Sequence, residues 1–387
     1  MILKDIKLIK NLAGKRVLLR LDLNVAVRDG QVDKDSTWRL EESIPTIKYL
    51  LAKKAKVIII AHLGRPGGQV LPEMSLLPVS KKLSQLLKKP IEFWADDFVG
   101  YEADSHDMVN GSVAMLENIR FQPREKMNCK RLAKRLAKLG DIYVNDAFSN
   151  SHRKHSSMHA ITEYLPSFAG PLLLSEVKEL SGVMKIKKGL VFIFGGAKME
   201  TKVKLIKDAS QISDQVLLGG ALANDILLAR GYKVGKSLVD KSLLKVAKKL
   251  DNPKIHLPID VLVAKTPKAK AYKSVVVDKI PATMMALDIG PATVDEYIDI
   301  LSQAKWVVWN GPLGYFENKN FIQGSKKILQ FLAKSSAKVI IGGGETVELL
   351  TELKLRDKFY FISTGGGAML TFMQGDKMPA LEVLKKK

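Results

Sequence analysis

What the chain lacks limits where and how it can work. It has one cysteine, Cys129, in 387 residues, so an internal disulfide and a cysteine-rich metal site are both excluded. This cysteine usage suits a reducing compartment, and we expect a cytoplasmic protein. Lysines interrupt every apolar run in the first ten residues, which argues against a signal peptide. No uninterrupted apolar stretch approaches the roughly 20 residues of a membrane-spanning helix, so we expect no membrane partner.

Acidic and aromatic residues are also scarce. The chain has 40 Asp and Glu against 62 Lys and Arg, a formal net charge of +22, and 7% aromatic residues. Such a charge can bind nucleic acid through counterion release, or attract small polyanionic substrates. The lysines are spread along the chain without interleaved aromatics that could stack on bases. We therefore interpret most of them as a solvated surface and keep nucleic-acid binding as a competing hypothesis.

Two common nucleotide-binding signatures are missing. Gly235-Lys236-Ser237 matches the end of a Walker A motif, but Arg230 stands where that motif requires its first glycine. No Gly-x-Gly-x-x-Gly follows the first apolar run of either half of the chain. Its absence argues against a dinucleotide dehydrogenase.

The first half alternates apolar runs with helical patterns, which predicts a parallel sheet with helices on both faces. Ligands bind such sheets at the carboxyl ends of the strands, and basic residues recur there. They are Arg20, Arg39 (at the start of the first helix), His62, Arg65, Arg120 and Arg153. Arginine at this density suits a small anion bound through phosphate and carboxylate, although any one of them could form a surface ion pair instead. His152, His155 and His159 lie among arginine and lysine without cysteine, which argues against a metal cluster.

The second half keeps the alternation, but its strand ends are rich in glycine. Gly195-Gly196, Gly219-Gly220, Asn310-Gly311-Pro312 and the glycine triplets at 342–344 and 365–367 each follow an apolar run. Glycine lets the backbone approach a ligand closely, and the unpaired N–H groups that open the next helix favour phosphate. The alternative is that these glycines only make tight turns. Because Lys198 and Lys202 add charge one helical turn apart, we predict a nucleotide's polyphosphate cradle, with the loops at 258–260 and 288–291 on its rim.

Ordered segments across both halves match one known family. They are RLDLNV at 20–25, AHLGRP at 61–66, LENIRF at 116–121, YVNDAF at 143–148, HRKHSS at 152–157, GGAK at 195–198, DIGP at 288–291, VWNGPLGYFE at 308–317, GGG at 342–344 and STGGGA at 363–368. Through these segments the chain resembles the phosphoglycerate kinases along essentially its whole length. So many matches in one order are far more specific than any single motif.

The resemblance implies an α/β protein with two Rossmann-like, doubly wound parallel-sheet domains that face each other across a cleft. The first, residues 1–165, would bind 3-phosphoglycerate, and the C-terminal tail at 372–387 would pack back on it. A connecting helix at 166–184 would lead to the nucleotide-binding domain at 185–371. The implied reaction transfers the acyl phosphate of 1,3-bisphosphoglycerate to MgADP, reversibly, giving 3-phosphoglycerate and ATP. We expect a monomer that acts on these small molecules and does not require nucleic acid.

The resemblance also assigns site residues by position. For the phosphoglycerate it implies Asp22, Asn24, Arg39, His62, Leu63, Gly64, Arg65, Arg120 and Arg153. For the nucleotide it implies Gly195, Lys198, Lys202, Gly219, Gly220, Gly290, Asn310, Pro312, Glu317 (on the ribose), Gly343, Gly344, Glu345 and Thr346, with Glu345 near the Mg²⁺. Our own candidates for neutralising charge during catalysis are Arg39, Lys198, Lys202, Gly366 and Gly367.

Transfer of a phosphoryl group between a carboxylate and a diphosphate needs no proton abstraction, so no general base is expected. Alignment and charge neutralisation carry the reaction instead, after the domains close and exclude water. The sequence departs from the family pattern where Glu345 replaces the usual aspartate, which changes the reach of the carboxylate toward the metal. Ala26 replaces a usual proline and Ser149-Asn150 a usual Gly-Thr, and we expect neither change to alter the reaction.

Overall fold

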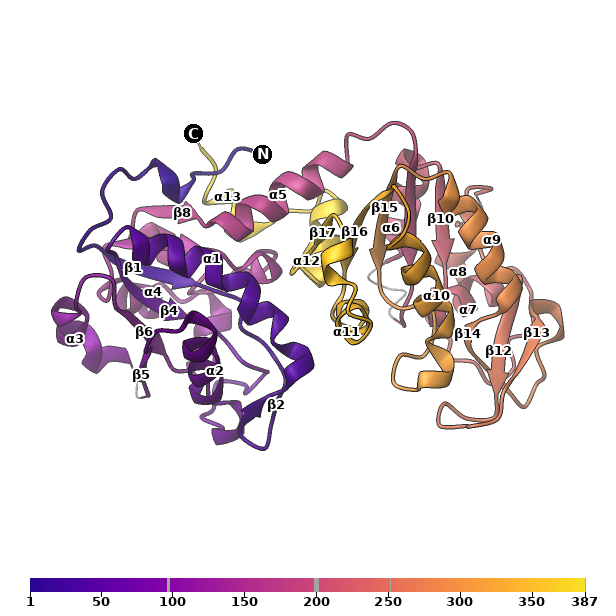
Figure 1. Ribbon diagram of the computed structural model, residues 1–387, viewed down its shortest axis with the longest axis horizontal. Helices are drawn as coiled ribbons and strands as arrows, with labels where there is room; N and C mark the ends of the chain where they lie inside the picture. Colours follow the sequence, from indigo (N-terminus) through magenta and orange to yellow (C-terminus); the bar gives the residue numbers. More distant parts are fainter. Residues whose placement is uncertain (96–97, 198–201, 251, 387) are drawn as a thin grey trace. The chain divides into compact units, whose positions relative to one another are not determined.

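The computed structural model describes residues 1–95, 98–197, 202–250 and 252–386. Figure 1 shows an α/β chain, and it separates into two compact units. Unit 1 comprises Met1–Leu180 with Gly375–Lys387, and unit 2 comprises Ser181–Gln374. The boundary falls inside α5 (Pro171–Val183), in the segment predicted to connect the two halves. Within the described ranges, no helix is both long enough and apolar enough to span a bilayer.

Unit 1 is organised around a parallel sheet with the strand order β5, β6, β4, β1, β7, β8. Its strands are β1 (Arg16–Arg20), β4 (Lys56–Ile60), β5 (Glu92–Trp94), β6 (Val113–Leu116), β7 (Ile142–Asn145) and β8 (Ser167–Ala169). The runs RVLLR and KVIII form the central strands β1 and β4, and nearly all of their residues are buried. Continuous apolar runs of this kind are typical of strands covered on both faces.

Helices pack on both faces of this sheet because successive strand residues point in opposite directions. Val17 and Leu19 of β1 pack with residues of α1 and α2, whereas Leu18 packs with residues of α4 on the other face. The helices of this half are α1 (Trp38–Ala52), α2 (Leu77–Leu87), α3 (Glu102–Asp107) and α4 (Lys130–Ala137). A short hairpin of β2 (Val27–Arg28) and β3 (Gln31–Val32) follows β1.

The C-terminal segment lies against the N-terminus within unit 1, as the two chain ends in Figure 1 show. The N–H of Lys4 donates to the carbonyl of Leu384 at 2.9 Å, and the N–H of Lys386 donates to Ile2 at 3.0 Å. Just before this, α13 (Pro379–Glu382) places the N–H of Ala380 3.1 Å from the carbonyl of Ser151. The tail therefore supports the loop that follows β7.

Unit 2 repeats the architecture with a parallel sheet in the order β11, β10, β9, β15, β16, β17. Its strands are β9 (Leu190–Phe194), β10 (Gln215–Leu218), β11 (Ile255–His256), β15 (Trp306–Asn310), β16 (Lys338–Gly342) and β17 (Phe361–Ile362). Its helices are α6 (Val203–Ile212), α7 (Gly220–Ala229), α8 (Leu244–Ala247), α9 (Pro291–Ser302), α10 (Gln323–Leu332), α11 (Gly344–Glu352) and α12 (Gly367–Met373). The predicted fold class, with two parallel-sheet units, is confirmed.

An antiparallel sheet in unit 2 corrects one prediction. It joins β13 (Lys273–Val276), β12 (Asp260–Ala264) and β14 (Met285–Ile289), where the sequence pattern indicated loops. Proline, aspartate and glycine at 258–260 and 288–291 resemble turn residues. Asp260 and Asp288 instead end up in strands, because Asp260 pairs with Val276 and Asp288 pairs with Leu262, residues 16 and 26 positions away in the sequence. A short-range pattern cannot reveal such pairing.

Candidate active site

In unit 1, four chain segments meet beyond the carboxyl ends of β4, β1 and their neighbours β6 and β7. The N–H of Gly64, after β4, donates to Asn24 Oδ1, after β1, at 2.8 Å. Arg120, after β6, donates from Nη1 to the carbonyl of Gly64 at 2.6 Å. Parallel strands bring their carboxyl ends to one edge, and these hydrogen bonds fix the loops there against one another.

Arg39 is placed by Asp22. Its Nη1 lies 2.6 Å from Asp22 Oδ2, and its guanidinium stacks over the ring of Trp38 at 4.7 Å from the centroid. Ser149, after β7, donates to the same carboxylate oxygen at 2.5 Å. Asp22 therefore joins the first turn of α1 to the loop after β7, and it restricts the arginine to few rotamers before any ligand binds.

His62 is buried and remains neutral. Burial, and then the charges of Arg20, Arg120 and Arg153, lower the pKa of His62 well below its usual value. Its Nδ1 lies 3.1 Å from Arg20 Nη2, and because that nitrogen of arginine can only donate, Nδ1 must accept. In the neutral ring the proton then resides on Nε2, so His62 can donate one hydrogen bond toward an anion.

Arginine side chains at this edge also perturb one another. Burial and the charges of Arg153 and Arg20 lower the pKa of Arg120 to about 10. Burial and the charge of Arg65 likewise lower the pKa of Arg153. Cations forced together in this way create a strongly positive potential, which a bound anion relieves. The cluster is therefore suited to a phosphate-bearing ligand.

Arg20 corrects the predicted arrangement of the arginines. Its side chain is 1% exposed, and it donates to Ser157 Oγ at 3.2 Å and to the carbonyl of Leu21. With His62 as its third partner, Arg20 lies beneath the cluster and orients the histidine. The sequence could not distinguish it from the other arginines, because all follow strand ends alike.

Glu125 was missed by the sequence analysis. It is fully buried, and it accepts hydrogen bonds from Ser157 Oγ at 2.6 Å and from the Ser157 N–H at 3.0 Å. Its negative charge counteracts the lowering of the Arg20 pKa by burial. It also anchors the loop that carries Arg153 and His155. Between Arg124 and Lys126 it resembles an ordinary surface residue, so no sequence signal could have found it.

In unit 2 the glycine-rich strand ends pack backbone against backbone. The N–H of Gly196 donates to the carbonyl of Pro312 at 2.8 Å, and that of Gly220 donates to Leu313 at 2.7 Å. A Cβ on Gly195 would lie 2.0 Å from the Pro312 carbonyl oxygen, and Gly220 has a φ of +64°. Side chains at these two positions would therefore collide or strain the backbone.

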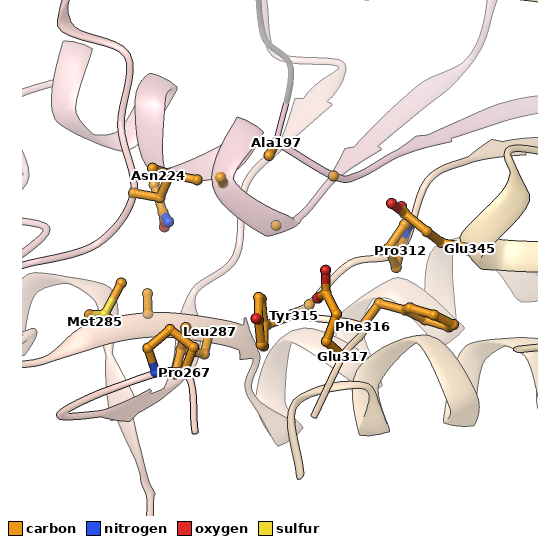
Figure 2. Close-up of a pocket in the computed structure, with 16 residues that line it drawn as sticks. Ala197, Asn224, Pro267, Met285, Leu287, Pro312, Tyr315, Phe316, Glu317 and Glu345 are labelled. Atoms are coloured by element: carbon orange, nitrogen blue, oxygen red, sulfur yellow. The ribbon is translucent and has the colours of Figure 1, made fainter. Parts of the chain in front are cut away.

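Beside these glycines lies a cavity of about 450 Å³ (Figure 2). Figure 2 shows Asn224 facing Met285, Leu287 and Pro267 across it, and the carboxylates of Glu317 and Glu345 on another side. The residues lining it include Gly196, Ala197, Gly220, Ala221, Leu238, Ala286, Pro312, Gly314, Tyr315 and Phe316. An apolar slot with a few polar groups and a glycine edge fits a planar base with an attached sugar and phosphates.

Lys202 immediately precedes α6 and is 7% exposed. Its Nζ donates to the carbonyl of Gly195, and a Cβ on Gly311 would lie 3.0 Å from that nitrogen. The ammonium group is therefore held among the glycine loops. Lys198, its predicted companion, lies outside the described residues.

The two glycine triplets have the predicted strand–turn–helix form. Gly343, with a φ of +96°, links β16 to α11, and Gly366, with a φ of +52°, precedes Gly367 at the start of α12. In the first turn of α11, Gly344 and Glu345 precede Thr346, which is fully buried. The Thr346 hydroxyl has no hydrogen-bond partner among the described residues.

Some predicted nucleotide residues lie elsewhere. Gly290 packs against Asp260, whose carboxylate accepts from Thr293 at the start of α9. Asp288 likewise accepts from the N–H of Gly324 at 3.0 Å. The two aspartates thus hold helix N-termini, and β14 supplies Met285, Ala286 and Leu287 to the wall of the cavity. Pro258 and Asp288 line only a smaller hollow, which shares Gly220 and Asn224 with this cavity. Gly195, Gly219 and Asn310 support the lining residues without being among them.

Within the described ranges, no three His, Cys, Asp or Glu residues gather as metal ligands. His152, His155 and His159 instead have pKa values lowered by burial, as befits neutral rings among cations.

Comparison with known proteins identifies the chain's relatives. A family model described as phosphoglycerate kinase matches residues 3–376. Phosphoglycerate kinases of Pelotomaculum thermopropionicum and Desulfosudis oleivorans are 40% and 41% identical over 384 and 397 residues, and the matches cover 97% and 99% of this chain and of each relative. The chain belongs to the phosphoglycerate kinase family.

Solved structures agree with this assignment. Phosphoglycerate kinases from Coxiella burnetii and Pyrococcus horikoshii match with TM-scores of 0.84 and 0.88, at 37% and 30% identity. Each match covers 99% of this chain and 98% of the solved chain. The predicted family and the predicted enzyme class, a phosphotransferase, are therefore confirmed.

Proposed function

We propose that the chain transfers the acyl phosphate of 1,3-bisphosphoglycerate to MgADP, reversibly, giving 3-phosphoglycerate and ATP. One observation supports this above the others. A chain of this family carries an arginine cluster at the sheet edge of one unit and a glycine-edged cavity at that of the other. The first suits a small phosphorylated acid and the second a nucleotide.

In this proposal Asp22, Asn24, Arg39, His62, Leu63, Gly64, Arg65, Arg120 and Arg153 form the phosphoglycerate site. Arg65, Arg120 and Arg153 supply the positive potential for the phosphate. Neutral His62 donates a hydrogen bond from Nε2, and Asp22 keeps Arg39 oriented for the transferring group. Asn24 and Gly64 position the loops through their mutual hydrogen bond.

The nucleotide would occupy the unit 2 cavity, with its base in the apolar slot and Glu317 on the ribose. Its phosphates would follow the glycine loops, the N-terminus of α11 and Lys202 with Lys198. Mg²⁺ commonly binds one or two carboxylates together with substrate phosphates, and the Glu345 carboxylate on the cavity wall fits this requirement. The ion would neutralise phosphate charge, and the buried Thr346 hydroxyl adds an unused oxygen nearby.

The chemistry rests on positioning and charge. A carboxylate or a diphosphate attacks without losing a proton, so no general base is needed. Arg39 and the two lysines would neutralise charge on the three equatorial oxygens of the transferring phosphoryl group, and the N–H groups at Gly366 and Gly367 would add hydrogen bonds. Since attack requires the reacting atoms to be about 3–3.5 Å apart, we propose that the two units close over their ligands during each turnover.

We expect a cytoplasmic monomer that acts on small molecules. Nucleic-acid binding stays the competing hypothesis, motivated only by the net charge of +22. It predicts affinity with a steep salt dependence and no effect of ADP.

The deciding experiment is ATP formation from ADP and 1,3-bisphosphoglycerate, titrated with magnesium. Saturable turnover is expected, and Arg39→Ala should lower kcat by about 10²-fold or more because its charge acts mainly in the transition state. Arg28→Ala is the matched control, since the Arg28 side chain is 79% exposed and pairs with Asp33 at the surface. Folded protein without turnover would refute the proposed function, and unchanged kcat in Arg39→Ala would remove Arg39 from the mechanism.

A further inference from the structure

A second cavity, of about 290 Å³, lies in unit 1 between the start of α4 and the segment before it. Its lining residues are Gln122, Pro123, Arg124, Cys129, Arg131, Leu132 and Arg135. None of the residues proposed for phosphoglycerate is among them. The charged groups that line it are three arginines, from two different segments of the chain.

The surroundings of this cavity are strongly basic. Residues 122–138 contain seven lysines and arginines and a single acidic residue, Glu125. Glu125 is buried and binds Ser157 on the core side, so it does not face the cavity. Two nearby carboxylates pair with lysines that do not line the cavity. Glu163 lies 2.7 Å from Lys130, and Glu102 lies 3.0 Å from Lys138.

The amphipathic pattern of α4 explains how the charges gather. Leu132 and Leu136 are buried in the unit 1 core, so the helix turns Arg131 and Lys134 outward on its other face. Arg124 approaches from the preceding segment. Two elements thus present guanidinium groups to one hollow, which is the arrangement that binds phosphate or carboxylate bidentately.

The Cys129 thiol, which lines this cavity, has a lowered pKa. Cys129 is half-buried and directly precedes α4. Backbone N–H groups at the start of the helix, that of Leu132 foremost, and the charge of Arg124 lower the pKa of this thiol. The cavity wall therefore already favours negative charge over neutral groups.

We propose that this cavity binds a small multivalent anion of the phosphate class, between Arg124 and Arg131 at the start of α4. Its volume admits a compact polyanion, and two guanidinium groups match a ligand with several charged oxygens. Its lining shares no residue with either proposed substrate site, and the proposal does not depend on the proposed reaction.

The single cysteine makes the test specific, because every thiol adduct must be on Cys129. Alkylation by neutral iodoacetamide is followed by mass spectrometry, with and without inorganic pyrophosphate and in the absence of magnesium. A bound anion covers the thiol and raises its pKa, and both effects slow alkylation, by about threefold or more at saturation. Slowing should weaken as salt is added.

Variants separate this site from the others. Arg124→Gln with Arg131→Gln should abolish protection, whereas Lys187→Gln with Lys188→Gln removes the same charge from exposed positions in unit 2 and should preserve it. Arg39→Ala should also preserve protection, because it impairs only the proposed phosphoglycerate site. Circular dichroism melting checks that each variant is folded.

Three results would overturn the proposal. They are no slowing at millimolar pyrophosphate, equal slowing in the Arg124 and Arg131 double variant, and stronger protection by a short RNA at the same phosphate concentration. The last result would make the basic face of α4 a nucleic-acid surface. Protection by pyrophosphate that exceeds protection by the RNA and is lost in the double variant supports the small-anion site.

Discussion

Glu125→Gln is the most informative single change, because it removes a charge and keeps the shape. Glu125 is fully buried, and both of its oxygens accept hydrogen bonds from Ser157, at 2.6 and 3.0 Å. Burial lowers the pKa of Arg20, and the charge of Glu125 is the main effect that opposes this. Arg20 in turn donates to His62. The change therefore reaches the proposed phosphoglycerate site through two buried neighbours.

The magnitude follows from opposing contributions. Glutamine keeps one oxygen acceptor but places an NH₂ group where the second Ser157 donor needs an acceptor, which costs about 1–3 kcal/mol. It also leaves Arg20 without its buried counter-charge, and breaking such pairs costs about 3–5 kcal/mol. Burial raises the pKa of Glu125, because burying its charge costs free energy, and removing the charge offsets part of the two losses above. We expect a net loss of about 2–4 kcal/mol in the stability of unit 1.

Two assays report this effect. A protein with two compact units need not unfold in one step, so hydrogen exchange of peptides from β1 and β7 measures unit 1 directly. The KM for phosphoglycerate should also rise, because the loop of Arg153 loses its anchor. Glu163→Gln is the matched control, since Glu163 is partly exposed and pairs with Lys130 at the surface. Exchange protection in Glu125→Gln equal to that of the wild type would refute the reasoning.

Three further predictions concern a buried aspartate, a glycine at a strand end and an exposed glutamate on the cavity wall. Burial raises the pKa of Asp146 from 3.8 to about 6, so the protonated side chain favours the folded state. This contribution to the free energy of unfolding is fully present below pH 3.8 and is lost as pH rises through 6. This amounts to about 3 kcal/mol, and Asp146→Asn should flatten the urea-midpoint profile across that window, whereas an unchanged slope would contradict the assignment. Gly195→Ala should weaken nucleotide binding and lower the melting temperature, because its Cβ would meet a backbone carbonyl oxygen at 2.0 Å. Gly182→Ala, in a helix with open space around it, should instead stabilise by about 0.5–1 kcal/mol, and equal melting temperatures for the two variants would argue against steric exclusion. Glu345→Gln should raise the magnesium concentration for half-maximal turnover by about tenfold or more, while Glu352→Gln, at the last residue of the same helix, should not; equal requirements would remove Glu345 from the metal site.

Much of the candidate site follows from local sequence. Glycine pairs and triplets after apolar runs indicated the loops of unit 2. Arg120 and Arg153 after similar runs, with Arg39 at the start of the first helix, indicated an anion site. Both sets of residues lie at the sheet edges because parallel strands bring their carboxyl ends to one edge whatever the intervening helices contain. The family matches then assigned roles that charge and spacing left open.

Other features required long-range contacts. The antiparallel sheet around β12 places Met285 and Leu287 on the cavity wall, although their segment reads as a turn-rich connection. Asp260 and Asp288 look like loop ligands but accept hydrogen bonds from helix N-termini instead. Whether a carboxylate faces a ligand or a helix depends on pairing between distant residues, which local pattern does not encode.

The sequence alone therefore determined the fold class, the family and the kinds of group at each strand end. Each depends on residue type, period and order along the chain, and these are local properties. Only the tertiary structure decided which polar side chains are buried beneath the candidate site and hold its loops in place. Arg20 and Glu125 are as polar as any surface pair, yet both are buried beneath His62 and the loop of Arg153. Burial changes pKa values and hydrogen-bond demand, and burial is fixed only when distant segments pack together.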